Sequence, residues 1–472
     1  MWSQGFGGAA GRRVAARADG LHLTAAQGRA PLLGPAKAPV DVWSYNGAVP
    51  GPELRVRQGD RLRLTLHNEL AEGTTIHWHG VRVPNAMDGV PHLTQAPVEP
   101  GQSFVYDFVA QDAGTFWYHP HQRSYEQVGR GLYGPLIVEE PEPIEVDRDL
   151  TWVLDDWRLD DDGQIGGGFG SRHDEMMAGR IGNTATINGV LPAPLKVRAN
   201  ERVRLRLINA ANARIFGFDF AGHKPVVIAI DGQPVEPHEP DGLVVLGPAM
   251  RIDLILDMTG SPGARMAVDD KFYEGLEYRL TDIEYASSPL RDRPLATSVA
   301  LPPNPIPEPV LDGAQRHEVR FGGGMMGMMG GRRVGGTPNR SGSSGMMGGG
   351  MMNSSRDGMM GGGMMGWTVN GVSASGHVHD PMLTIPRGRT AVLNLVNDTA
   401  WWHPIHLHGH TFRVVSRNGV PTARREWQDT VLMAPQETAE IAFVADNPGD
   451  WMFHCHILEH QAAGMMAAIR VD

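Results

Sequence analysis

A pattern of alternating apolar and polar residues that occurs three times constrains the fold of this chain more than any other feature. It covers residues 54–68, 195–209 and 383–397, and in each copy a Gly or Asn interrupts the alternation. Alternation at period two is typical of half-buried strands, and the interrupting residue suits a turn. An Asn-Gly dipeptide, a strong turn signal, precedes the copies at 46–47, 188–189 and 370–371. The pattern predicts an all-β fold of three related domains, each a Greek-key β-sandwich or barrel.

Shifts in composition predict where the domains end. The length of 472 residues suits about three domains. An acidic stretch at 139–143 and a Pro-rich stretch at 301–309 are typical of linkers, which predicts domains at 1–143, 144–309 and 310–472. In the third domain, residues 322–366 hold 12 Met and 18 Gly, so we expect a Met/Gly-rich loop rather than a core there.

Charge and cysteine content exclude several classes of protein. The net charge of −11 argues against a nucleic-acid binder. The single Cys excludes an intramolecular disulfide and any zinc or iron–sulfur site built from several cysteines. No apolar run reaches the ~18 residues that span a bilayer, and residues 14–20 lack the apolar character of a secretory signal. We expect neither a nucleic-acid nor a membrane partner.

Ten of the 20 His fall into four tight clusters in the predicted outer domains. The clusters are His77-Trp78-His79-Gly80, His119-Pro120-His121, the stretch with His403, His406 and His408, and His454-Cys455-His456 with His460. On a strand, residues i and i+2 point to the same face, so both imidazoles of a His-x-His pair can reach one group of ions. Neutral imidazoles suit zinc, iron, nickel or copper.

The only Cys narrows the choice of metal. Cys455 together with His403, His460 and Met465 offers two imidazoles, a thiolate and a thioether, the ligand set of a blue-copper electron-transfer site. His454 and His456 flank Cys455 and point to the opposite face of the strand. A one-electron site is thereby joined to a multi-histidine cluster through a few covalent bonds, an arrangement suited to the four-electron reduction of dioxygen to water.

These motifs, in this order, resemble the multicopper oxidases over about residues 49–466, in particular the three-domain bacterial laccases and copper-efflux (cuprous) oxidases. The resemblance implies three cupredoxin domains, four copper ions and a catalytic electron path through His454, Cys455 and His456. It implies a type 1 copper held by His403, Cys455, His460 and Met465. It implies a type 2 copper held by His77 and His406. It implies a type 3 pair held by His79, His119, His121, His408, His454 and His456.

Two positions bear on proton supply. Asp88 matches the family acid that delivers protons near the type 2 site, and the alternative is a turn residue in Asp88-Gly89. Gln461 follows the last type 1 histidine, where bacterial relatives often carry a Glu that serves the proton relay. An amide cannot shuttle protons as a carboxylate does, so either Asp88 with water suffices or another acid substitutes.

Other candidates carry weaker signals. His377 and His379 have His-x-His spacing but sit in a Gly/Ser-flanked stretch, which favours surface residues. His410 lies on the face of His406 and His408, and His92 is a candidate for lining a substrate or solvent route. The remaining histidines fit solvated or structural positions: His22, His67, His173, His223, His238 and His317. Candidate carboxylates for Cu(I) near the type 1 site are Asp357, Asp380 and Asp398.

We therefore expect a laccase-like oxidase whose partners are dioxygen and either small phenolic or aromatic reductants or Cu(I). Thioethers favour Cu(I), and the Met pairs of residues 322–366 occupy the place where copper-efflux oxidases insert a Met-rich flap. Alternative functions for the protein are a dedicated cuprous oxidase for copper tolerance, a non-catalytic copper-binding protein, and a nitrite reductase. For residues 322–366 alone, the alternative is a linker without function. We expect a monomer, and copper chemistry and the family favour a periplasmic or secreted enzyme.

Overall fold

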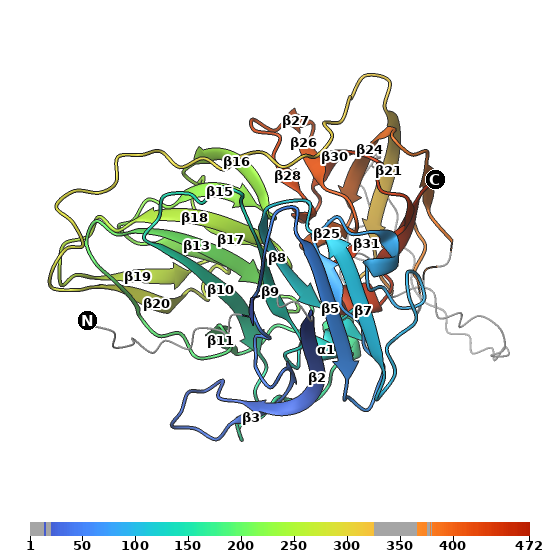
Figure 1. Ribbon diagram of the computed structural model, residues 1–472. Helices are drawn as coiled ribbons and strands as arrows, with labels where there is room; N and C mark the ends of the chain where they lie inside the picture. Colours follow the sequence, from blue (N-terminus) through green and yellow to red (C-terminus); the bar gives the residue numbers. More distant parts are fainter. Residues whose placement is uncertain (1–13, 16–19, 325–365, 375–377, 379) are drawn as a thin grey trace, which may run out of the picture.

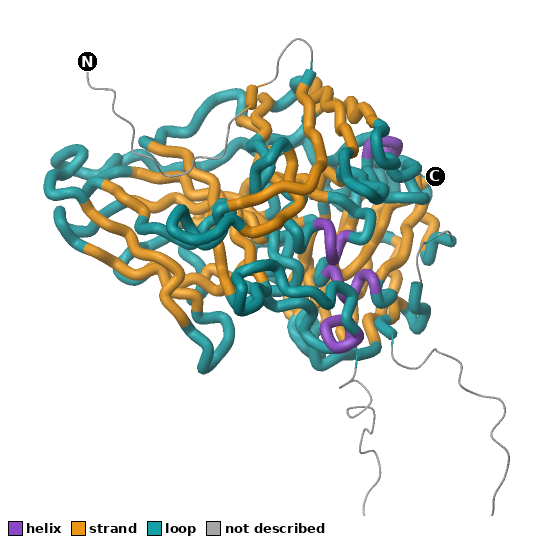
Figure 2. The backbone as a smooth tube through the Cα atoms, turned by 90° about the horizontal axis from the view of Figure 1, so that it is seen from below, coloured by secondary structure: helices purple, strands orange, loops and turns teal. Residues whose placement is uncertain are grey.

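The computed structural model describes residues 14–15, 20–324, 366–374, 378 and 380–472. In this part of the chain the strands form six sheets, two from each third of the sequence. Figure 1 shows the three groups of strands side by side, in blue, green and orange to red. Figure 2 shows how little of the backbone is helical. The predicted all-β fold of three cupredoxin-like domains is confirmed.

The first domain pairs a four-stranded sheet with a five-stranded one. In order across the first sheet the strands are β3 (Val40–Tyr45), β2 (Leu21–Ala30), β5 (Arg61–Asn68) and β7 (Ser103–Val109). Across the second they are β1 (Val14–Ala15), β4 (Leu54–Arg57), β9 (Gly134–Glu139), β8 (Gly114–His119) and β6 (His77–His79). The short helices η1 (Asn85–Met87) and α1 (Ser124–Gln127) lie in loops after β6 and β8.

The second domain pairs a six-stranded sheet with a five-stranded one, with helix α2 (Arg172–Met176) between β10 and β11. Across the first sheet the strands are β11 (Thr184–Ile187), β10 (Arg148–Trp157), β13 (Arg202–Asn209), β18 (Arg251–Asp257), β15 (Val226–Ile230) and β16 (Gln233–His238). Across the second they are β12 (Leu195–Val197), β20 (Tyr278–Tyr285), β19 (Arg265–Asp270), β14 (Phe216–Phe220) and β17 (Val244–Leu246).

The third domain has a seven-stranded and a five-stranded sheet, with helix α4 (Leu458–Ala462) directly after the cysteine strand. The larger sheet runs β22 (Thr368–Val369), β21 (Gln315–Gly322), β24 (Thr390–Asn397), β30 (Thr438–Val444), β26 (Phe412–Arg417) and β27 (Val420–Pro421), with β28 (Trp427–Gln428) also on β26. The smaller runs β23 (Leu383–Ile385), β32 (Met466–Val471), β31 (Gly449–Cys455), β25 (His403–Leu407) and β29 (Thr430–Met433). The boundaries predicted at 143/144 and 309/310 stay predictions.

The threefold sequence pattern has a threefold structural counterpart. Its two runs form β4 and β5, β12 and β13, and β23 and β24, and in each copy the two strands belong to different sheets of the domain. The interrupting residue takes a positive φ in every copy: 88° at Gly59, 65° at Asn200 and 79° at Gly388. This residue therefore carries the chain across the domain core from one sheet to the other, which is why Gly or Asn stands there.

A buried Asn ends each copy and ties down the loop that follows it. In the second domain the Asn209 amide donates 2.8 Å hydrogen bonds to the carbonyls of Arg214 and Leu246, and its oxygen accepts from the Ala211 N–H at 3.0 Å. Asn68 and Asn397 repeat this pattern in the other two domains. At least three side-chain hydrogen bonds per copy therefore stabilise one loop in every domain.

We predict that Asn209→Ala lowers the thermal midpoint of the protein by about 5 °C, because three buried backbone groups lose their partner at a cost of roughly 1 kcal/mol each. Calorimetry on wild type and variant measures the shift. Gln102→Ala, at an exposed turn position of the first domain, serves as the control. A midpoint for Asn209→Ala no lower than that of the control contradicts the assigned role.

Candidate metal centre

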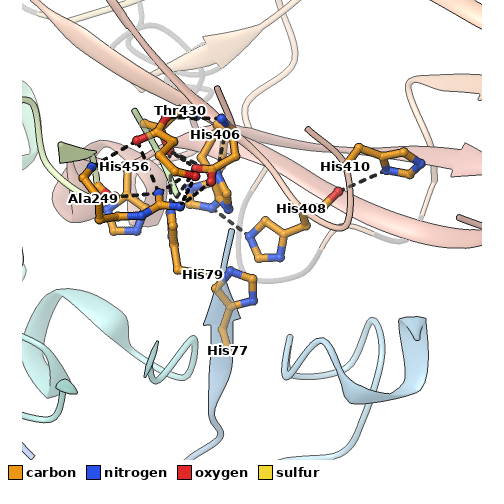
Figure 3. A network of polar contacts seen from close by, with 12 residues as sticks. His77, His79, Ala249, His406, His408, His410, Thr430 and His456 are labelled. Atoms are coloured by element: carbon orange, nitrogen blue, oxygen red, sulfur yellow. Dashed lines mark hydrogen bonds and ion pairs between the residues drawn. The ribbon is translucent and has the colours of Figure 1, made fainter. Parts of the chain in front are cut away.

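Eight of the ten clustered histidines meet in one buried space between the first and third domains. His77 pairs with His119 across β6 and β8, and His406 pairs with His454 across β25 and β31. These strand pairs place imidazoles side by side on each domain and face the two sets toward one another (Figure 3). All of the second domain is described, and it supplies none of these side chains.

The imidazole nitrogens converge closely enough to share ions. Among the described residues, three groups of three histidines each place their nitrogens within 4.8 Å of one another. The groups are His77/His79/His406, His77/His121/His408 and His79/His119/His456. The eighth histidine is His454, whose Nε2 lies 3.1 Å from Nε2 of His408.

Backbone carbonyls set the tautomers of the cluster. Nδ1 of His77 lies 2.8 Å from the Asp88 carbonyl, Nδ1 of His406 lies 2.8 Å from the Asp429 carbonyl, and Nδ1 of His454 lies 2.8 Å from the Cys455 carbonyl. Because a carbonyl oxygen only accepts, each of these Nδ1 atoms carries the proton and each Nε2 keeps a free lone pair. The lone pairs face inward, as metal ligation requires.

Unpartnered nitrogens test whether a metal fits this space. Within the described part of the chain, Nε2 of His77, His121 and His406 and Nδ1 of His79 and His456 are buried without a hydrogen-bond partner. Buried polar atoms normally have partners, so ligation by copper would satisfy these atoms. Burial and neighbouring imidazoles lower the pKa of nearly all of these rings, which keeps them in the neutral, metal-binding form: His79, His119, His121, His406, His408, His454 and His456.

A second, separate site contains the cysteine. The Cys455 sulfur lies 3.4 Å from Nδ1 of His403 and 3.9 Å from Nδ1 of His460, and the two Nδ1 atoms are 3.3 Å apart. The Nε2 atoms are engaged elsewhere, with the Thr399 hydroxyl at 2.8 Å and the Met177 carbonyl at 2.7 Å, so both Nδ1 atoms face the sulfur. All three side chains are fully buried.

Met465 lies beside this cysteine site. Its carbonyl accepts a 3.1 Å hydrogen bond from the Cys455 N–H, and its buried side chain belongs to the same apolar core as Cys455. Burial raises the pKa of the Cys455 thiol well above its usual range, so the metal-free protein holds a protonated thiol. Copper must displace that proton, and the soft thiolate and thioether suit copper well.

One strand joins the two sites. In the register of β25 and β31, Ile405 lies opposite Cys455 and His406 lies opposite His454. Neighbouring side chains alternate across a strand, so Cys455 faces the apolar core while His454 faces the histidine cluster. His456 follows directly, and its Nε2 lies 3.4 Å from Nε2 of His119 in the first domain. Along the chain, the two sites are therefore joined covalently through the backbone between adjacent residues.

Comparison with known proteins agrees with this geometry. Family models described as multicopper oxidase match residues 30–143, 148–272 and 351–472. The multicopper oxidase MmcO of Mycobacterium tuberculosis is 31% identical, over 95% of this chain and 86% of that protein. The chain belongs to the multicopper oxidases. The family holds four copper ions, which the two sites accommodate, and reduces dioxygen with electrons taken from reducing substrates.

Two further relatives extend the comparison. Laccase-1 of Botryotinia fuckeliana is 28% identical, over 89% of this chain and 77% of that protein. The crystal structure of the multi-copper oxidase from Pseudomonas thermotolerans superposes with a TM-score of 0.81 at 34% identity, over 98% of this chain and 100% of that one. The likeness therefore covers the whole three-domain architecture of this multicopper oxidase.

Asp88 lies against the cluster rather than in a solvent-exposed turn. Its carboxylate places Oδ2 2.9 Å from Nδ1 of His408 and Oδ1 3.2 Å from Nδ1 of His77. The side chain is buried, although it follows the 3-10 turn η1 as its Asp-Gly context predicts. Asp88 therefore lies in the loop after η1 and at the same time contacts two cluster histidines.

Gln461 lies beside His121 of the cluster. Its amide nitrogen is 3.4 Å from Nδ1 of His121, and its amide oxygen is 3.5 Å from the Ser124 hydroxyl. Both Gln461 and His121 line a cavity of about 260 Å³, whose apolar wall includes Met452 and Met466. A neutral amide and a cluster histidine thus line this cavity side by side.

The structure places the weaker candidates outside the two sites. His92 is exposed and does not line the cavity, although its neighbours Pro91 and Leu93 do. His410 is buried behind His408, with its Nδ1 3.3 Å from the His408 carbonyl, and its ring faces away from the cluster in Figure 3. Asp398 forms a 2.7 Å ion pair with Arg320 at the surface.

Some of the predicted features lie beyond the described ranges. His377, His379, Asp357 and all the paired Met of residues 325–365 lie outside the described residues. Asp380 is described and exposed. Within the described ranges, no helix combines the length and apolar character needed to cross a membrane.

Sequence reasoning missed several residues that surround the two sites. Asp429 contacts His79 and His406, and Arg251 of the second domain holds Asp429. Trp367 packs its ring 4.2 Å from that of His460, and the chain after α2 covers the outer edge of His460. None of these residues lies within a histidine motif, so no local spacing signals them.

We predict that the copper-free protein loses stability steeply as the pH falls from 6.5 to 5. Nine of the ten clustered histidines have pKa values below the ordinary 6.5, and that of His460 is about 3. Below pH 6.5 the unfolded chain binds protons that the folded chain excludes, so stability present above 6.5 is lost on acidification, by up to about 1.4 kcal/mol per imidazole for each pH unit.

Thermal unfolding of the metal-free protein between pH 7.5 and 5 measures this slope. A variant with His119→Gln and His121→Gln removes two of the nine groups and should show a shallower slope. A midpoint that is independent of pH in the wild type contradicts the burial of neutral imidazoles.

Proposed function

We propose that this enzyme couples one-electron oxidation of phenolic or aromatic compounds, and of Cu(I), to the four-electron reduction of dioxygen to water. The observation that carries the proposal is the strand in which Cys455 belongs to one site while the adjacent His454 and His456 belong to the other. A storage protein does not need such a link, and a nitrite reductase does not need eight further clustered histidines.

The proposed division of ligands is the one that the family resemblance implies. His403, Cys455, His460 and Met465 hold the type 1 copper. His77 and His406, whose inward Nε2 atoms are unpartnered, hold the type 2 copper. The six others hold the type 3 pair: His79, His119, His121, His408, His454 and His456. When bound, the coppers supply one-electron redox steps and the site at which dioxygen accepts four electrons.

The chain's own residues fix how electrons enter. His460 is fully buried, because the carbonyl of Met177 caps its Nε2 and the ring of Trp367 covers its face. A donor therefore docks on this covering layer rather than on the imidazole itself. A thin protein layer of this kind admits both small aromatic donors and a metal ion as electron sources.

A dedicated cuprous oxidase is the second candidate, and one observation favours it. The two described ends of the Met/Gly-rich segment meet at Trp367, since Gly324 packs against its indole and Gly366 precedes it. Trp367 in turn contacts both type 1 histidines, His403 and His460. A segment rich in soft Cu(I) ligands is therefore attached at the point where electrons enter.

Proton supply rests on Asp88 in this proposal. Its carboxylate contacts two cluster histidines at 2.9 and 3.2 Å, whereas the carboxylate of Asp429 is held in a bidentate ion pair with Arg251 and Gln461 cannot release a proton. We further propose a periplasmic or secreted location, which copper chemistry and the family resemblance support.

Oxygen uptake with two donors tests the proposal. We predict that wild type consumes dioxygen with a phenolic dye and with Cu(I), and that Cys455→Ser loses both the blue colour and the uptake, because the thiolate carries the electron. Blue colour without oxygen uptake in the wild type contradicts oxidase function.

A variant lacking residues 324–365 should keep the dye activity and lose most of its response to added copper. An unchanged copper response in that variant contradicts the role of the Met segment.

We predict that Asp88→Asn lowers kcat by about 10²-fold, because the amide keeps the contacts but cannot donate the proton. Anaerobic reduction of the blue site by the donor should keep its wild-type rate, while reoxidation by dioxygen slows. Asp112→Asn is the matched control, since Asp112 is equally buried in the same domain but pairs with Arg82. Equal losses in both variants contradict the assignment to Asp88.

A further inference from the structure

The guanidinium of Arg251 is a point at which all three domains meet. Arg251 begins β18 in the second domain and is fully buried. Its Nε donates to the Thr115 carbonyl of the first domain at 3.2 Å. Its two terminal nitrogens lie 2.9 and 2.5 Å from the carboxylate oxygens of Asp429 in the third domain. The ion pair with Asp429 is therefore bidentate and lies in a fully desolvated junction.

The second domain supplies a further acid that orients this pair. Asp231 lies 3.4 Å from the guanidinium, and its carbonyl accepts from Arg251 at 3.0 Å. The same carboxylate accepts the backbone N–H groups of Asp429 and Thr430 at 3.2 and 3.0 Å. Side chain and backbone of Asp429 are thus both held by the second domain.

Asp429 in turn contacts one histidine from each outer domain. Its Oδ1 lies 3.2 Å from Nε2 of His79 and 3.3 Å from Nδ1 of His406. The two rings are stacked with centroids 3.7 Å apart and planes 20° from parallel. In Figure 3, the network around Thr430 and Ala249 lies directly against His406 and His79. The Asp429 carboxylate therefore contacts both rings at once, and the Thr430 hydroxyl contacts the same two nitrogens at 3.2 and 3.1 Å.

Gly80 shows that the first domain is shaped around the same ion pair. It follows His79 and has a φ of +82°. A Cβ at this position would overlap the Arg251 guanidinium and the Asp429 carboxylate. The glycine of the His77-Trp78-His79-Gly80 motif thus leaves the space that the pair occupies.

We propose that Arg251 is a positioning residue for the histidine cluster. Through Arg251, the second domain, which supplies no histidine to the cluster, holds His79 and His406 in their metal-binding orientation. Without the guanidinium, the Asp231 and Asp429 carboxylates face each other in a desolvated space, and their repulsion drives Asp429 away from the two rings. Loss of such a partner behind metal ligands typically weakens metal binding about 10- to 100-fold.

Arg251→Met and Arg251→Lys test the proposal. The readouts are copper ions retained per chain after dialysis against a chelator, the electron paramagnetic resonance signal of type 2 copper, and the near-ultraviolet band of the type 3 pair. We expect Arg251→Met to lose cluster copper about 10- to 100-fold more readily than wild type and to keep the visible type 1 band. Arg251→Lys keeps the charge without the bidentate geometry, so its loss of cluster copper should be intermediate between those of the wild type and Arg251→Met.

Arg204→Met is the matched control for burial. Arg204 lies on the neighbouring strand β13, is equally buried, and pairs with Glu140 and Asp253 instead. If Arg204→Met releases cluster copper as readily as Arg251→Met, the effect is general loosening of the domain interface and the proposal is overturned.

Gly80→Ala tests the same junction from the first domain and remains informative if Arg251→Met does not fold. It should reproduce the selective loss of cluster copper, because its methyl displaces the ion pair. Gly101→Ala controls for backbone strain, since Gly101 has a φ of +77° and a Cβ there meets no described atom within 4 Å. Full copper retention in Gly80→Ala overturns the proposal. These readouts need no donor, so they stand apart from the test of the proposed function.

Discussion

The structure depends on keeping a group of imidazoles neutral and ordered in a buried space. Burial disfavours the charged ring, and neighbouring rings disfavour it further, so each neutral ring offers one nitrogen lone pair and keeps one N–H. The same burial makes an unsatisfied N–H costly. Backbone carbonyls of Asp88, Asp429 and Cys455 meet that requirement on the outer side of the cluster. The inner nitrogens are left for metal.

The three domains share one plan but take unequal parts in it. The outer two supply the ligands, because their strands end at the interface between them. The second domain supplies contacts of another kind: Arg251 and Asp231 hold Asp429 beside the cluster, and the Met177 carbonyl contacts His460 of the cysteine site. It thus contacts both sites without supplying a residue to either metal-binding group among the described residues.

Electron transfer and oxygen chemistry are kept apart by the alternation of one strand. Cys455 is enclosed by the apolar core of the third domain, while His454 and His456 face a polar cluster with acidic neighbours. The two environments differ in polarity, yet only the backbone between adjacent residues separates them. This arrangement explains why one strand can serve a soft one-electron site and a multi-metal site together.

Much of this was predictable from the sequence, and the remainder has a definite physical reason. Strand alternation, His-x-His spacing and the flanked Cys455 are local patterns, because a strand presents every second side chain to one face. They determined the all-β class, the ligand types and the link between the sites. Alternation is the same whether successive strands pair or not, so only the structure showed that the two runs of each copy lie in different sheets. Arg251, Asp429 and Trp367 are decided by packing between distant segments, which no spacing along the chain records.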